Sequence, residues 1–293
     1  MQIKYGFKKE WCQFTRTFRL GGIILALVSF AIADPLMYKL IDVMMETITS
    51  GDMFAGIAAA LTSLDAEMAM DMNDMMTEMS AMYNNAKLIY AVTNAEFCST
   101  SVLIICLILM STAGGEQKKR ATIIPACSGL EYVNYLIPKF VLYPATVFVL
   151  SFLSSLIAGL ICNAVFTENL ISGGMLLLSA TLCGVYVAFI VAVFLSVGIC
   201  TSRPGVTVVF IYIGSTLIEL ILSSLELTKY HPFALRSLIT GQMADASFVL
   251  ADNVASIAVG VILSVVLGVV MFFLALGVLN AKKINNQEDA PEF

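Results

Sequence analysis

Six long runs of apolar residues dominate this chain of 293 residues and decide what it can fold into. Each run is close to or above the roughly 20 residues with which an α-helix crosses the hydrocarbon core of a bilayer. The runs cover residues 20–38, 91–113, 140–165, 170–200, 206–225 and 254–279. We therefore expect an all-α membrane protein with six transmembrane helices, built as one domain over residues 20–279.

The overall composition excludes most soluble classes of protein. Hydrophobic residues make up 59% of the chain and charged residues 13%, whereas soluble domains carry about 25% charged residues. So few charges do not cover a water-facing surface, which argues against a soluble enzyme and against a disordered chain. The net charge of −5 also argues against a nucleic-acid partner.

The distribution of lysine and arginine predicts the orientation, because cytoplasmic loops of membrane proteins are enriched in both. With a cytoplasmic N-terminus, the outer side carries only four of the 16 basic residues. These four are Lys39, Lys87, Lys229 and Arg236. We expect both termini to be cytoplasmic, with residues 280–293 as a tail, in a multi-pass protein of the plasma or inner membrane.

The first 19 residues are expected to form an interfacial helix. Phe7, Trp11, Phe14 and Phe18 recur at steps of four, three and four, which places them on one face of a helix. Lysine and arginine occupy much of the remainder, as in helices that lie along the headgroups of an anionic leaflet. The alternative is an ordinary solvated basic tail.

Residues 39–90 are expected to form a long, helical outer loop. Met68, Met72, Met75, Met79 and Met82 recur at steps of four and three, as on one face of an amphipathic helix. A methionine face packs against varied apolar surfaces. We expect it to contact the protein or a partner, while a lipid-like cargo and Cu(I) bound by thioethers remain alternatives.

Residues 114–139 form the predicted inner loop between the second and third spans. The segment is basic at its start, and Pro125 and Pro138 bound a stretch that suits a short amphipathic helix. We interpret this loop as a docking surface for a cytoplasmic partner. A solvated connector is the alternative.

Polar and small residues within the spans give two further hypotheses. Glu219 lies inside the fifth span, where a carboxyl group either contacts substrate or is protonated or hydrogen-bonded between helices. Small residues recur every four positions in the third, fourth and sixth spans, which predicts that these three pack tightly. The residues are Ser151, Ser155, Gly159, Ala180, Gly184, Ala188, Ala192, Ser196, Cys200, Gly260, Ser264 and Gly268.

With this topology, the inner loop resembles that of the permease subunits of type-2 ATP-binding cassette (ABC) transporters. Those proteins have six spans, cytoplasmic termini and an N-terminal interfacial helix. Residues that occupy comparable places in the family's loop are Glu116, Thr122, Ser128 and Lys139. The sequence departs from the family pattern at Ala121, Gly129 and Pro138.

The resemblance implies that the inner loop carries a coupling helix seated in an ATPase subunit. The coupling residues would be Glu116, Thr122, Ile123, Ile124, Pro125, Ser128, Leu130 and Lys139. The working particle would hold two permease chains, identical or related, and two cassette ATPases in a lipid membrane. ATP and Mg²⁺ would bind only to the ATPases, because this sequence has no GxxxxGK[ST] phosphate loop.

We therefore expect a non-catalytic permease subunit that exports a hydrophobic or amphipathic cargo, such as a lipid, peptide or drug. One alternative is an ATP-independent secondary carrier, although such carriers usually show broken helices and several charges at mid-membrane. A second alternative is a membrane scaffold or sensor that does not transport. No histidine pair or acidic cluster supports a membrane enzyme.

Overall fold

Six membrane-spanning helical segments make up most of the protein. The computed structural model describes residues 2–50, 83–112, 131–201, 203–225, 227, 229–241 and 248–288. Within these residues, six segments are long and apolar enough to cross a membrane, which confirms the predicted multi-pass, all-helical class. The spans are α2 (Arg19–Ser50), α5 to α6 (Ala86–Leu109), α9 (Tyr132–Val165), α10 (Gly173–Thr201), α11 (Pro204–Ser224) and α13 (Leu250–Glu288).

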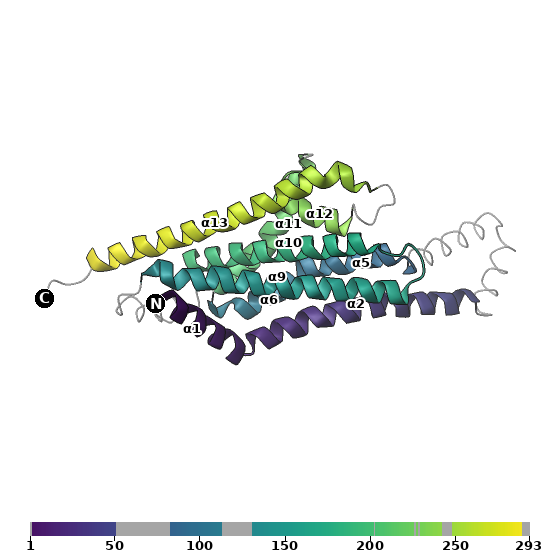
Figure 1. The fold of residues 1–293 in the computed structure, drawn as a ribbon, viewed down its shortest axis with the longest axis horizontal. Helices are drawn as coiled ribbons and strands as arrows, with labels where there is room; N and C mark the ends of the chain where they lie inside the picture. Colours follow the sequence, from purple (N-terminus) through teal and green to yellow (C-terminus); the bar gives the residue numbers. More distant parts are fainter. Residues whose placement is uncertain are drawn as a thin grey trace.

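A separate N-terminal helix precedes the first span. This helix, α1 (Gln2–Arg16), ends two residues before α2 begins. Phe18 in the link has a φ of 57°, a left-handed conformation that a bulky residue seldom adopts and that interrupts a helix. The break lets α1 run at an angle to α2 along the bundle (Figure 1).

Several helices extend beyond the apolar runs, and two of these extensions carry charged side chains that form ion pairs. The apolar run of the first span ends at residue 38, whereas α2 continues to Ser50. An ion pair of 2.6 Å between Lys39 and Asp42, three residues apart, joins neighbouring side chains within this extension. Likewise α9 begins at Tyr132 and places Lys139 two turns inside the helix.

The second span is not a uniform α-helix. It consists of α5 (Ala86–Glu96), a π-helical turn η1 (Phe97–Ser101) and α6 (Val102–Leu109). Asn85 caps α5 by accepting a hydrogen bond from the amide of Leu88 at 3.2 Å. Such π-helical turns are rare and concentrate at functional positions.

The central helix of the bundle is α10. It packs against α9 and α13, and also against α11, α6 and the short helix α12 (Pro232–Thr240). In its most apolar stretch 78% of the residues are buried, against 11% for α11 and for α13. The bundle core therefore surrounds α10, while α11 and α13 form an outer layer.

The helices leave a consistent set of segments at each end of the bundle (Figure 1). Helix α1, the start of α9 and the C-terminal end of α13 lie at one end, here called the α1 end. The end of α2, the start of α5 and the connection from α9 to α10 lie at the other. There the amide of Ala86 donates to the carbonyl of Glu168 at 3.0 Å and ties α5 to that connection.

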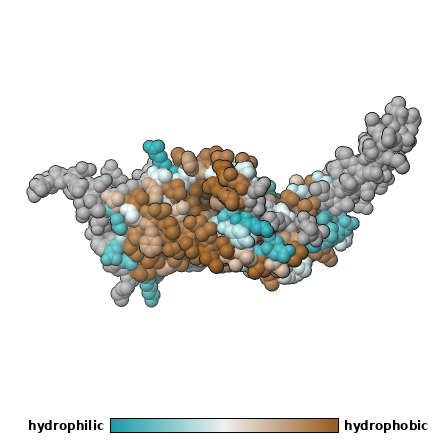
Figure 2. Space-filling view, turned by 90° about the horizontal axis from the view of Figure 1, so that it is seen from above, coloured by the Kyte–Doolittle hydropathy of each residue, from teal (hydrophilic) through white to brown (hydrophobic). Residues whose placement is uncertain are grey.

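The surface matches a bilayer environment. Figure 2 looks onto the side where α13 lies and shows a broad hydrophobic area with hydrophilic residues toward both ends. Helices α11 and α13 contribute many exposed large apolar side chains, including Phe210, Leu220, Ile262 and Phe273. In water such an area would favour aggregation, whereas hydrocarbon tolerates it.

Candidate functional site

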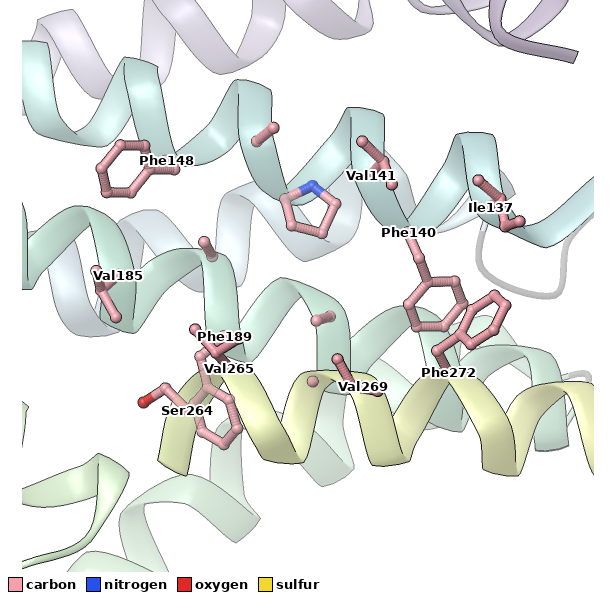
Figure 3. Close-up of a pocket in the computed structure, with 15 residues that line it drawn as sticks. Ile137, Phe140, Val141, Phe148, Val185, Phe189, Ser264, Val265, Val269 and Phe272 are labelled. Atoms are coloured by element: carbon pink, nitrogen blue, oxygen red, sulfur yellow. The ribbon is translucent and has the colours of Figure 1, made fainter. Parts of the chain in front are cut away.

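An apolar groove with a volume of about 460 Å³ lies between α9, α10 and α13. Figure 3 shows α9 and α13 on its two sides, with α10 between and behind them. Its lining residues are Ile137, Phe140, Val141, Pro144, Ala145 and Phe148 of α9, Val185, Ala188, Phe189 and Ala192 of α10, and Ser264, Val265, Gly268, Val269 and Phe272 of α13.

Small side chains create this groove. Ala188 and Ala192 on α10, with Ser264 and Gly268 on α13, leave the space between the helices unfilled. All four belong to the small-residue stripes from which the sequence predicts tight packing. The prediction holds between α9 and α10, because a Cβ at Gly184 would lie 3.0 Å from the Phe148 carbonyl oxygen. Between α9 and α13 the same kind of residue borders open space instead.

The groove offers almost no hydrogen bonding to a ligand. Ser264 is the one polar side chain among its 15 lining residues, and its hydroxyl donates to the carbonyl of Gly260 at 2.7 Å. A polar ligand group would lose its hydrogen bonds to water here without replacement, at a cost of roughly 2–7 kcal/mol. The groove therefore suits a hydrocarbon ligand.

At the α1 end, α1 is fixed closely to the start of α9. Gly6, Glu10 and Phe14 are four residues apart and share one face of α1. A Cβ at Gly6 would lie only 2.9 Å from Cγ of Pro138. Phe14 is fully buried and meets the ring of Tyr143 edge-on, with centroids 5.2 Å apart. Helix α1 is thus a packed part of the bundle.

A buried ion pair occupies the middle of this contact. The Lys139 ammonium lies 3.4 Å from Oε1 of Glu10, and the two side chains are 0% and 2% exposed. Tyr143 donates a hydrogen bond to Oε2 of Glu10 at 2.9 Å. The ammonium also lies 4.9 Å from the centroid of the Tyr135 ring, within the range of a cation–π interaction.

This geometry separates the predicted interfacial residues. Phe14 faces the protein, whereas Trp11 and Phe18 are exposed, at 48% and 74%. Phe7 is partly exposed. The exposed rings and the exposed Lys4, Lys8, Lys9 and Arg16 of α1 suit a membrane interface, so that assignment stays a prediction for these residues.

Glu219 forms an ion pair with Arg236. Its Oε2 lies 2.7 Å from Nη1 of Arg236, which joins α11 to α12. His231 fixes the start of α12, because its Nδ1 accepts a hydrogen bond from the amide of Ala234 at 2.9 Å. Glu219 is not among the residues that line the groove. Its role in a translocation path stays a prediction, and the structure gives it a partner between helices.

A chain of buried hydrogen bonds links the second, third and fourth spans. The Tyr90 hydroxyl lies 3.0 Å from the Ser155 hydroxyl, which donates to Oδ1 of Asn94 at 2.7 Å. Nδ2 of Asn94 then donates to the Ser179 hydroxyl at 3.2 Å. The sequence predicts Ser155 only as a small packing residue and does not predict this chain of hydrogen bonds. Asn94, whose amide side chain lies inside an apolar run, is the sequence feature from which a buried hydrogen-bond network could have been predicted.

Several predicted site residues lie outside the described part of the chain. They are Glu116, Thr122, Ile123, Ile124, Pro125, Ser128 and Leu130 of the coupling segment, and the five methionines of the outer loop. Lys139 is the one predicted coupling residue that the structure places. It is buried against α1, so any part that it has in coupling is indirect.

The described residues hold no group of three or more His, Cys, Asp or Glu side chains that could bind a metal ion. Comparison with known proteins gives no match: no protein-family model, no curated protein and no solved structure is significantly similar to the chain.

Proposed function

We propose that this chain is the permease subunit of an ATP-driven ABC-type exporter, which moves a hydrophobic or amphipathic cargo across the plasma or inner membrane. A homodimer, or a pair with a related chain, would form the pathway together with two cassette ATPases. Both termini would be cytoplasmic, and the α1 end would face the cytoplasm.

The apolar groove is the observation that carries the proposal. Transport of an apolar cargo requires a site at membrane depth that accepts hydrocarbon, and the groove has one polar side chain, already hydrogen-bonded within its own helix. Val141, Val265 and Val269 on its edge are each more than half exposed. Cargo could therefore enter sideways from the bilayer.

Helix α9 provides a direct mechanical connection between the predicted coupling segment and the groove. The segment 114–139 ends inside α9, whose groove-lining residues begin at Ile137. The ion pair of Lys139 with Glu10 holds this first part of α9 against α1. A push on the coupling segment would then move α1 and the α9 side of the groove together.

ATP hydrolysis is assigned to a separate subunit. The sequence lacks a phosphate loop of the GxxxxGK[ST] type, so ATP and Mg²⁺ would bind to the cassette ATPases. On this proposal the chain itself is not an enzyme. It converts the movement of the ATPases into a change in the shape of the groove.

The test is assembly with a candidate cassette ATPase. We expect the two to co-purify, and a variant with Ile123, Ile124 and Leu130 all replaced by Glu to lose at least tenfold of the bound ATPase. Ile3→Glu, a charge on the exposed face of α1 at the same end of the bundle, is the control and should assemble normally. Unchanged assembly and ATPase activity in the triple variant would contradict the proposal.

A further inference from the structure

We infer that the groove between α9, α10 and α13 binds one acyl chain of a phospholipid from the leaflet at the α1 end. That this lipid is also the transported cargo rests on the proposed function. The binding site itself rests on the chemistry, depth and edges of the groove.

The chemistry of the lining selects hydrocarbon. Fourteen of the 15 lining residues have apolar side chains or none, and the hydroxyl of Ser264 is already engaged by the Gly260 carbonyl. No charged side chain lines the groove. A peptide backbone or a charged drug would leave unsatisfied polar groups in it, whereas an alkyl chain has none.

The length and position of the groove match one leaflet. Its α9 side runs from Ile137 to Phe148, which corresponds to about 16 Å at the helical rise of about 1.5 Å per residue. Half of a hydrocarbon core of about 30 Å is about 15 Å. These residues occupy the first half of α9, toward the α1 end. On α10 and α13 the lining residues lie near the middle of the helices, so the groove extends from the acyl chains of that leaflet to the centre of the bilayer.

Aromatic rings bound the groove along its length and leave its side open. Phe140 and Phe272 meet edge-on at its α1 end, with ring centroids 5.5 Å apart. Phe148 and Phe189 line its other end (Figure 3). Between them Val141 and Val269, on opposite edges, are half exposed. An acyl chain would thus enter laterally and lie lengthwise, at a site distinct from the open lipid-facing surface of α11.

The experiment measures lipid that survives purification. The chain is purified in detergent with a trace of phosphatidylglycerol that carries a photoreactive diazirine in one acyl chain, then irradiated and mapped by mass spectrometry. We expect each labelled chain to carry a single lipid, with the label on the α9 and α13 edges of the groove.

Two matched pairs of variants identify the site. Gly268→Leu on α13 fills the groove and should lower labelling at least fivefold, while Gly277→Leu, on the same helix with open space around it, should not. Ala145→Leu fills the groove from its exposed α9 edge, and its control Ala164→Leu lies on α9 away from it. The second pair decides the matter if Gly268→Leu does not fold.

Equal labelling in the groove-filling and control variants would overturn the inference. Label spread evenly over α9, α11 and α13 would also overturn it, because such a distribution indicates annular lipid only. Efficient disulfide cross-linking of two copies through a Val269→Cys substitution would overturn it too, because a second chain would then cover the groove. The assay uses no ATPase or nucleotide, so its failure is distinguishable from failure of ATP-driven transport.

Discussion

At the scale of single residues, two ion pairs join helices of the bundle. Lys139 is fully buried with Glu10, and in such a pair the loss of one partner leaves an uncompensated charge in a medium of low dielectric constant. Glu219 pairs with Arg236 across α11 and α12. Both pairs connect a peripheral helix to the bundle, which gives each a clear structural role whatever part it has in transport.

We expect Lys139→Met to destabilise the protein by about 3–5 kcal/mol, because Glu10 would keep its buried charge without a partner. The double variant with Glu10→Gln should regain most of this loss. Thermal unfolding in detergent measures the effect, with Lys8→Met on the exposed face of α1 as a control within about 0.5 kcal/mol. A change at Lys139 as small as the control's would show that the pair does not hold α1 in place.

At the scale of elements, the sequence predicts the spans well and their contacts poorly. Apolar runs of bilayer length mark a helix without regard to its neighbours, which is why all six spans were predictable. The spacing of the aromatic residues 7–18 predicts that all four lie on one membrane-facing side of α1. In the structure Phe14 instead shares a second, overlapping face with Gly6 and Glu10 and packs against α9. Periodicity defines faces but does not say which one a neighbouring helix covers.

The groove was not predictable for a related reason. Its shape depends on small residues from α10 and α13 that come together only in three dimensions. A stripe of small residues permits close packing but does not require it, since the large side chains around it decide whether helices meet. Similarly, the pair of Glu219 and Arg236 spans 17 positions and depends on the turn into α12.

The contact between α9 and α10 gives the element-scale prediction. Gly184→Ala should destabilise the bundle by roughly 1–3 kcal/mol, because the added Cβ would lie 3.0 Å from both the ring and the backbone oxygen of Phe148. Gly214→Ala on α11 is the control, since its Cβ would meet nothing within 4 Å, and it should stabilise slightly through helix propensity. Thermal unfolding of both variants checks this, and equal effects would contradict the close approach of α9 and α10.

At the scale of the whole molecule, three features lie along one helix. The predicted coupling segment ends inside α9, the buried ion pair fixes the start of α9 to α1, and the groove lies along the same helix. The outer helices α11 and α13 present apolar surface to lipid. We propose that a separate ATPase drives a lipid-like cargo through this arrangement.

Lipid movement in reconstituted vesicles tests that claim most directly. Vesicles containing the chain, with or without a candidate cassette ATPase, receive a fluorescent phospholipid whose transfer between leaflets is followed by chemical quenching of the outer leaflet. We expect transfer only when the chain, the ATPase, ATP and Mg²⁺ are all present, and slower transfer for Gly268→Leu than for Gly277→Leu. Equal transfer by the chain alone without nucleotide, or none in the complete system, would contradict it.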